Sequence, residues 1–214
     1  MLRAIVAALI LLVLGSVSRG ADHSQYGHFE GPLNIQLLKD GRTARLLAPF
    51  VFIDPDQKTW TAPQGLGTDG ASIPRALWSV VGSPWTGLYR DAAVIHDAYC
   101  DSHAEPWQAV HKVFFNGMLA NGVDPLQAKI MYAAVYRFGP RWDFAYASKK
   151  CENCASVPYH VDQFTPTASS AKMRMLREKI EKTNPSIEEI ETESDVAVTN
   201  ELTKKQVGTP VLVR

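Results

Sequence analysis

The chain has 214 residues, of which 46% are hydrophobic and 21% charged, and its formal net charge at pH 7 is zero. This composition excludes a disordered chain or a strongly basic nucleic-acid binder, because both carry an excess of one charge. A single long apolar run excludes a polytopic membrane protein, and the length predicts one domain of about 100–150 residues with additional segments. Three cysteines are too few for a disulfide scaffold.

Residues 1–20 have the pattern of a secretory signal peptide. Arg3 precedes the uninterrupted apolar run Ala4–Leu14, and small and polar residues follow as far as Gly20. The run is too short for a membrane-spanning helix, which needs about 20 apolar residues. We therefore predict an exported protein, periplasmic or secreted; the alternative is an uncleaved signal that anchors the chain to the membrane.

The segment after the signal predicts short antiparallel strands. Two apolar runs, 34–38 and 44–53, flank the segment 39–42, whose Asp-Gly dipeptide is a strong hairpin signal. The segment 54–56 ends the second run, and 58–61 predicts a third short strand.

Helices are predicted after the strands. Caps, prolines and glycines place them at about 72–81, 87–99, 106–120 and 125–138. Strands first and helices later are typical of an α+β fold, here a small N-terminal antiparallel sheet packed on a layer of three to four helices. The predicted domain covers residues 28–145.

A connector at 146–164 contains a Cys-x-x-Cys pair, Cys151 and Cys154. In an exported protein this pair favours a structural disulfide, and pairing of one of the two with Cys100 is the alternative. A redox or zinc role is less favoured because neither a thioredoxin-like setting nor a full ligand set is visible.

Residues 165–214 predict a flexible charged tail that is partly helical or disordered. Residues 171–182 can form one charged helix, because Met173, Leu176 and Ile180 fall on one stripe. The acidic block at 188–195 is typical of a solvated or disordered stretch. We expect this tail to be available to a partner protein.

Two of the predicted helices bring His96 and His111 together. The two residues lie at similar distances from the loop 101–105, so their heights match within about one turn if the helices are antiparallel. With Asp97 beside His96, the set Asp97, His96 and His111 would suit a divalent metal ion such as zinc. In the alternative arrangement His96 is a general base oriented by Asp69 or His111, and Asp97 holds a calcium ion.

The catalytic candidates are therefore His96, Asp97 and Asp69, with Arg75 and Tyr99 as further site residues. A histidine and a carboxylate on an apolar helix require partners, because an unpaired buried charge is costly. A purely structural role is the competing interpretation: His96 is then a hydrogen-bonded core residue, Asp69 forms a cap or turn, and Arg75 is solvated.

Two motifs carry a resemblance to a known family. The runs Thr-Asp-Gly-Ala-Ser-Ile-Pro-Arg (68–75) and Ala-Ala-Val-Ile-His-Asp-Ala-Tyr (92–99) resemble a bacterial and phage family of domains of unknown function. The resemblance covers about residues 45–142 and implies a small α+β domain without an established activity. The family pattern has Ala-Asp where this chain has Val110-His111, so His111 either replaces that carboxylate as a ligand or leaves the site inactive.

A second, weaker likeness is to the secreted calcium-dependent phospholipases. His96, Asp97 and Tyr99 are similar to the helical His-Asp-Tyr pattern of those enzymes, which implies a water activated by His96 beside a metal on Asp97. The chain departs from them in lacking a cysteine-flanked calcium loop and a disulfide set.

These observations lead to two functional hypotheses. The first is an exported metal-assisted hydrolase acting on a lipid or cell-wall ester or amide, with zinc or calcium as the cofactor. The second is a noncatalytic envelope or phage-derived interaction protein whose His-Asp cluster is structural. No nucleic-acid partner is expected.

Overall fold

The structure, a computed structural model, describes residues 23–40, 43–69, 87–146 and 158–207. The predicted signal peptide, the predicted helix at 72–81 with Arg75, and the Cys151–Cys154 pair lie outside the described residues. Within these described ranges, no helix has the length and apolar character needed to cross a membrane.

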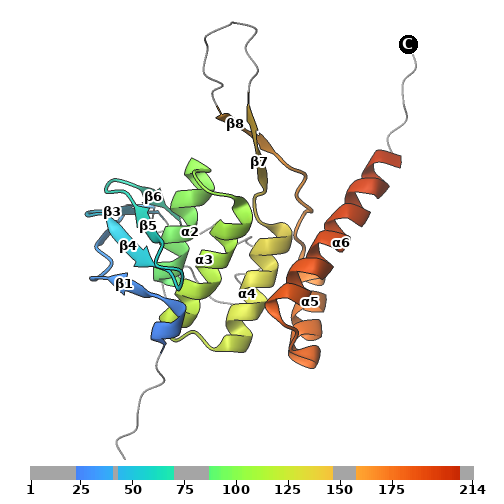
Figure 1. The fold of residues 1–214 in the computed structure, drawn as a ribbon, viewed down its shortest axis with the longest axis horizontal. Helices are drawn as coiled ribbons and strands as arrows, with labels where there is room; N and C mark the ends of the chain where they lie inside the picture. The colour runs from blue at the N-terminus through green and yellow to red at the C-terminus, as the bar shows by residue number, and fades with distance from the viewer. Residues whose placement is uncertain (1–22, 41–42, 70–86, 147–157, 208–214) are drawn as a thin grey trace, which may run out of the picture.

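Two small antiparallel sheets form the N-terminal part of the fold (Figure 1). One sheet has the order β1–β4–β5, formed by His28–Glu30, Phe50–Ile53 and Thr59–Ala62. The other has the order β2–β3–β6, formed by Ile35–Leu37, Ala44–Leu46 and Gly67–Thr68. The predicted hairpin is confirmed by the pairing of β2 with β3, in which Ile35 faces Leu46.

The apolar run 44–53, predicted as one strand, forms two. β3 ends at Leu46 and β4 begins at Phe50, and the two strands belong to different sheets. Pro49 lies in the break, and a proline has no N–H to give to a sheet ladder. The break therefore lets one continuous apolar run contribute to both sheets.

The predicted helices among the described residues are confirmed as α2 (Arg90–Ser102), α3 (Trp107–Ala120) and α4 (Pro125–Phe138). A short 3₁₀ turn, η1 (Ser24–Tyr26), precedes the first strand. Asp124 caps α4 by accepting hydrogen bonds from the backbone N–H groups of Leu126 and Gln127, and Pro125 occupies the first helical position.

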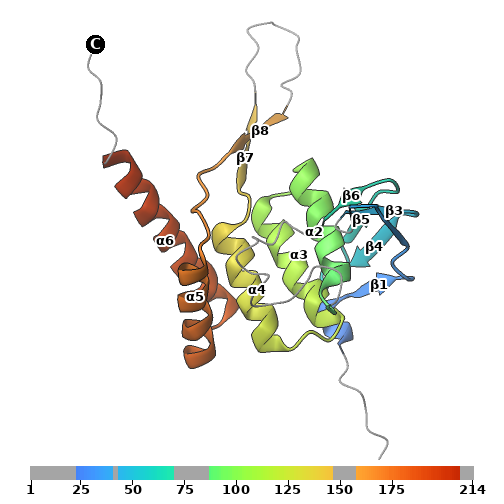
Figure 2. The ribbon, with the colours of Figure 1, turned by 180° about the vertical axis from the view of Figure 1, so that it is seen from behind.

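Helix α2 lies between the sheets and α3, and α3 lies between α2 and α4, in both views of the ribbon (Figures 1 and 2). A single apolar core runs through these layers. Its largest buried side chains include Phe50, Phe52, Tyr89, Phe114, Tyr132 and Trp142. The predicted α+β architecture, with an N-terminal sheet on a helical layer, is confirmed.

The tail differs from its prediction. The helix expected at 171–182 is found as α5 (Ser170–Thr183), but the acidic block expected to be solvated or disordered forms the first half of α6 (Ile187–Val207). Two apolar residues of this helix, Ile190 within the block and Val198 after it, are buried and hold the helix against the protein.

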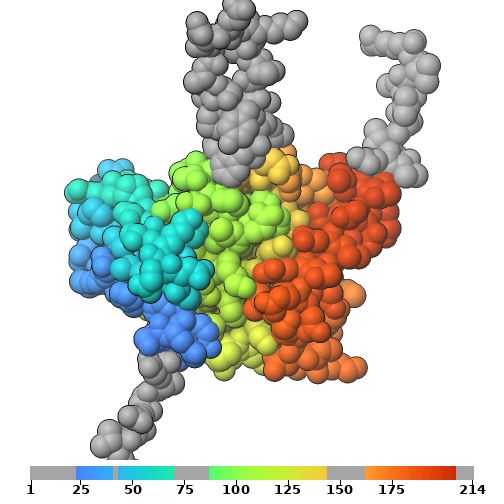
Figure 3. All heavy atoms as spheres, in the orientation of Figure 1, coloured from blue at the N-terminus to red at the C-terminus, as the bar shows by residue number. Residues whose placement is uncertain are grey.

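Helices α5 and α6 form a hairpin that packs on α4, at the end of the molecule opposite the sheets (Figure 3). A two-stranded ribbon of β7 (Trp142–Tyr146) and β8 (Pro158–Asp162) connects α4 to this hairpin.

Candidate functional site

Helices α2 and α3 bring His96 and His111 into direct contact, as the loop count predicted. His96 Nε2 and His111 Nδ1 are 2.8 Å apart, and both residues are 0% exposed. The connecting loop is tight because α2 ends at Ser102, His103 adopts a left-handed conformation with φ of 51°, and α3 begins at Trp107.

A third potential metal ligand, Cys100, lies on the same helix as His96. Cys100 lies one turn after His96 on α2, and its Sγ is 3.6 Å from His96 Nε2 and 3.7 Å from His96 Nδ1. The potential ligand atoms of His96, Cys100 and His111 all lie within 4.8 Å of one another. We call these three residues the His–Cys–His cluster. Cys100 was not predicted as a ligand, although its i, i+4 spacing from His96 was the available signal.

Hydrogen bonds define the tautomers of the two imidazoles. The Pro140 carbonyl, which can only accept, is 3.1 Å from His111 Nε2, so this nitrogen carries the proton. His111 Nδ1 is then a lone pair that accepts from His96 Nε2–H. His96 Nδ1 in turn is left without a proton, within 3.7 Å of the Cys100 thiol. In the metal-free protein the His96 Nε2–H therefore occupies the His111 Nδ1 lone pair, so both imidazoles can bind one metal ion only after His96 changes its tautomer.

The apolar surroundings keep both rings neutral. Phe114 lies 5.0 Å from the His96 ring and Trp107 lies 5.5 Å from the His111 ring. Burial lowers the pKa of His96 to about 3. It also holds the pKa of His111 well below its usual value, and the nearby His96 and Arg141 lower it further. Neutral imidazole is the form that binds a metal ion.

Asp97, the residue after His96, lies between the cluster and the surface. Its Oδ1 is 4.0 Å from His96 Nδ1, and its Oδ2 accepts a 2.5 Å hydrogen bond from Thr68 Oγ1. Asp97 also lines a pocket of about 270 Å³, which we call the acidic pocket; its lining residues are Thr43, Gly67, Thr68, Asp69, Asp97 and Asp101.

The predicted site residues thus divide between two places. His96 and His111 belong to the His–Cys–His cluster, whereas Asp69 and Asp97 line the acidic pocket together with Asp101, which was not predicted as a site residue. Successive helical residues point about 100° apart, which explains why His96 and Asp97 face different environments.

Tyr99 takes a structural position. Its hydroxyl accepts a 3.1 Å hydrogen bond from the Thr61 backbone N–H, and its ring meets Trp60 edge-on at 4.8 Å. Tyr99 therefore joins α2 to β5 and does not face the His–Cys–His cluster. Arg75, the other predicted partner, lies outside the described residues.

The donor set of the cluster fits a transition-metal ion. In a tetrahedral zinc site with bonds of about 2.0–2.1 Å to nitrogen and about 2.3 Å to sulfur, the nitrogen–sulfur separation is about 3.6 Å and the nitrogen–nitrogen separation about 3.4 Å. The Cys100–His96 distance of 3.6 Å matches, and the two imidazoles at 2.8 Å have to separate slightly.

His111 also has an acceptor at its outer ring nitrogen. The Pro140 carbonyl oxygen lies 3.1 Å from His111 Nε2, whereas the Asp97 carboxylate is 4.0 Å from His96 Nδ1, beyond hydrogen-bond distance. An outer acceptor like that of His111 is characteristic of metal-binding histidines, whose orientation and tautomer it fixes.

Fold and site together define the molecule as an α+β protein with a buried His–Cys–His cluster between two antiparallel helices. Residues 44–135 match a protein family described as "Protein of unknown function (DUF1353)", which confirms the resemblance predicted from the two motifs. No solved structure is significantly similar to the chain.

Two relatives come from Sinorhizobium fredii. The "Uncharacterized protein y4iH" is 44% identical over 115 residues, which make up 52% of this chain and 48% of the relative. The "Uncharacterized protein y4jT" is 35% identical over 157 residues, or 72% of this chain and 46% of the relative. The chain thus spans about half the length of these curated relatives.

Proposed function

We propose that this protein is a metal-assisted hydrolase whose divalent ion is held by His96, Cys100 and His111. The observation that carries the proposal is the approach of two neutral imidazoles and a thiol to within 4.8 Å in a buried position. Two histidines and a cysteine on facing helices suit zinc and leave a coordination position for water or substrate.

Metal uptake by these residues requires a defined redistribution of protons. The Cys100 thiol loses its proton to solvent, because the thiolate is the ligand. The proton of His96 moves from Nε2 to Nδ1, where the Asp97 carboxylate is 4.0 Å away. His111 keeps its proton on Nε2, bonded to the Pro140 carbonyl. One proton is therefore released for each ion bound.

A bound divalent ion polarises a carbonyl and lowers the pKa of a coordinated water. The residues of this chain supply the surroundings for that chemistry. Asp97 lies between the cluster and the acidic pocket, so it borders both the histidine and the space through which a substrate would approach. Thr68 fixes the Asp97 carboxylate through its 2.5 Å hydrogen bond.

The compartment and the substrate class follow from the predicted signal peptide. An exported hydrolase would meet lipids and cell-wall polymers, so we propose an ester or amide of that origin as its substrate. N-terminal sequencing of the exported protein tests this step: a chain that still begins at Met1 would contradict removal of the signal.

The test of the proposal combines metal analysis with hydrolysis. We expect the purified protein to retain about one zinc ion per chain and to hydrolyse members of a panel of p-nitrophenyl esters and peptide amides. A chelator abolishes this activity, and added zinc restores it. A protein that binds no divalent metal would contradict the proposal.

Complete burial of both histidines favours a second candidate, a noncatalytic interaction protein. Both residues are 0% exposed; in this candidate the cluster ties α2 to α3, and the C-terminal helices contact a partner. A metal-loaded protein that hydrolyses no substrate of the panel, with His96→Ala lowering stability alone, would support this candidate.

A further inference from the structure

We infer that Arg141 is a positioning residue for His111, and that Asp195 of α6 holds Arg141 in place. The C-terminal hairpin is thereby coupled to the His–Cys–His cluster. The effect of this coupling on metal binding rests on the proposed function, whereas its effect on the tautomer of His111 does not.

The coupling begins in the turn that follows α4. Gly139 lies against the His111 ring, because a Cβ built on it would be 3.2 Å from His111 Cε1 and 2.3 Å from the Val135 carbonyl oxygen. The next residue, Pro140, accepts the His111 Nε2–H with its carbonyl oxygen. The position of this turn therefore decides which nitrogen of His111 carries the proton.

Arg141 holds the turn in that position. Its guanidinium donates a 2.7 Å hydrogen bond to the Tyr136 carbonyl oxygen and lies 4.3 Å over the Trp107 ring. Trp107 in turn packs edge-on against His111, at 5.5 Å. Arg141 thus supports His111 twice: through the adjoining Pro140 carbonyl and through the indole of Trp107.

Asp195 supplies the counter-charge for Arg141. Its Oδ1 accepts a 3.2 Å hydrogen bond from Arg141 Nη1, and its Oδ2 accepts one of 3.3 Å from the Tyr136 hydroxyl. The Arg141 side chain is only 5% exposed, and a buried guanidinium requires compensation of its charge. A carboxylate on α6 therefore fixes a cation that lies over the rings of Trp107 and Tyr136, both of which meet the His111 ring edge-on.

The supporting residues lie beyond the segment that matches the family, which ends at residue 135. These supporting residues nevertheless contact His111, a buried histidine of the matched segment. The C-terminal hairpin thus has a chemical consequence for the His–Cys–His cluster besides covering α4.

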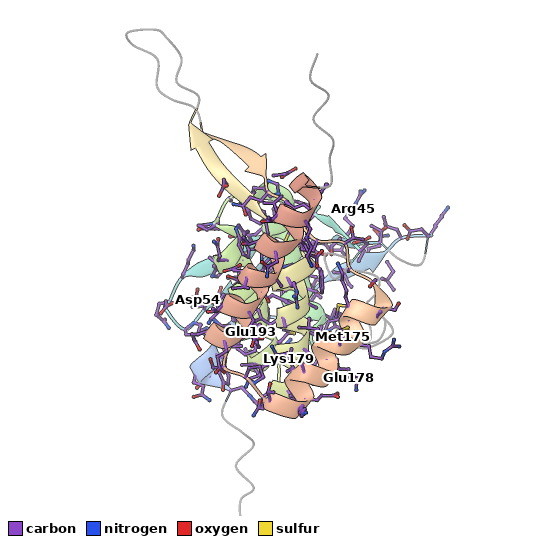
Figure 4. The ribbon with its side chains drawn as sticks, turned by 90° about the vertical axis from the view of Figure 1, so that its right-hand side faces the viewer. Arg45, Asp54, Met175, Glu178, Lys179 and Glu193 are labelled. Carbon is purple, nitrogen blue, oxygen red and sulfur yellow. The ribbon has the colours of Figure 1, made fainter. Side chains whose placement is uncertain are left out.

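The matched comparison uses two carboxylates of α6. Asp195→Ala removes the partner of Arg141, whereas Glu193→Ala removes the partner of Lys179, a residue of α5 at 2.6 Å. Figure 4 shows Glu193 and Lys179 together, between α6 and α5. Both variants delete one exposed acidic group from the same helix, but only Asp195→Ala disturbs the support of His111.

The readout is the tautomer of His111 in the metal-free protein, measured by long-range ¹H–¹⁵N NMR of the imidazoles. We expect a single Nε2–H tautomer in the wild type and in Glu193→Ala, and a mixture of tautomers in Asp195→Ala. Zinc affinity falls by about 10-fold in Asp195→Ala and by up to about 100-fold in Arg141→Met, the range found for outer partners of metal ligands. Arg141→Lys recovers part of the loss.

The outcomes separate this inference from the proposed function. An unchanged tautomer and a zinc affinity within about twofold of wild type in a folded Asp195→Ala variant would overturn the inference. Equal changes in Asp195→Ala and Glu193→Ala would overturn it as well. A changed tautomer in Asp195→Ala, in a protein that binds no zinc, would support the inference and contradict the proposed function.

Discussion

Helix α2 borders two neighbouring regions that have opposite properties. They are the His–Cys–His cluster and the acidic pocket. His96 and Asp97 are consecutive, yet His96 faces two neutral, buried donors and Asp97 faces an open pocket with two further aspartates. The cluster offers imidazole nitrogen and sulfur, whereas the pocket offers carboxylate and hydroxyl oxygen.

This difference in donor atoms distinguishes between zinc and calcium, the two metals expected from the sequence. Nitrogen and thiolate ligands select zinc and related transition metals, whereas calcium takes six to eight oxygen ligands. The donor set of the cluster therefore favours zinc. The phospholipase-like arrangement, with calcium on Asp97, would instead place the ion in the acidic pocket.

The largest expected effect is the loss of folding stability in acid, caused by the histidines of the cluster. Burial lowers the pKa of His96 to about 3 and that of His111 well below 6.5, so both stay neutral in the folded state while the unfolded chain takes up protons. Stability is therefore complete above about pH 6.5 and falls as the pH drops towards 3, by up to about 1.4 kcal/mol per pH unit for each histidine.

Denaturant unfolding of the metal-free protein between pH 7 and pH 4.5 measures this effect. His111→Asn removes one of the two titrating groups and should reduce the slope of stability against pH. Equal slopes in the wild type and in His111→Asn would show that the cluster does not control acid stability.

Removal of a ligand should have the next largest effect. His96→Ala deletes the imidazole that contacts both Cys100 and His111, so zinc affinity should fall by more than about 100-fold, beyond the loss caused by outer partners. Isothermal titration calorimetry measures the affinity, and circular dichroism verifies the fold. Zinc binding of wild-type strength in His96→Ala would place the ion elsewhere, with the acidic pocket as the next site to test.

Cys100→Ser tests the sulfur ligand and the proton balance together. The wild type should release about one proton per zinc ion, measured as the dependence of the binding enthalpy on the ionisation enthalpy of the buffer. The variant should bind zinc at least about tenfold more weakly. With cobalt, its spectrum should lack the sulfur-to-metal charge-transfer band. A cobalt spectrum identical to that of the wild type would exclude Cys100 from the coordination sphere.

Much of the fold could be predicted from local signals. Asp124 and Pro125 mark the start of α4 because a cap and a fixed φ act within one turn, and the loop between α2 and α3 is short enough to count. The His96–His111 contact follows from that count. These features depend on residues close in sequence, where elementary geometry leaves few alternatives.

The remaining features depend on contacts between distant residues. Pro140 meets His111 across 29 residues, and Asp195 meets Arg141 across 54. The acidic block of α6 was expected to be solvated or disordered, because its charge pattern alone does not show that Glu191 bonds to Tyr132 of α4 and Asp195 to Arg141, just after α4. The division of His96 from Asp97 into two environments likewise depends on where the sheets and α3 pack around α2.

The smallest effects on zinc affinity should come from substitutions in the acidic pocket. They show whether Asp97 and Asp101, both on α2, differ in their influence on the cluster. Asp97→Asn removes the charge that faces His96 Nδ1 at 4.0 Å, so zinc affinity should fall by about 10-fold as the outer acceptor weakens. Asp101→Asn removes an equal charge from the same pocket, but Asp101 does not belong to the cluster, so affinity should stay within about twofold.

The two variants carry the same substitution on one helix, and long-range electrostatics would weaken binding in both alike. A loss confined to Asp97→Asn would therefore identify a direct effect on His96, whereas equal losses would show that the pocket and the cluster act as one charged site.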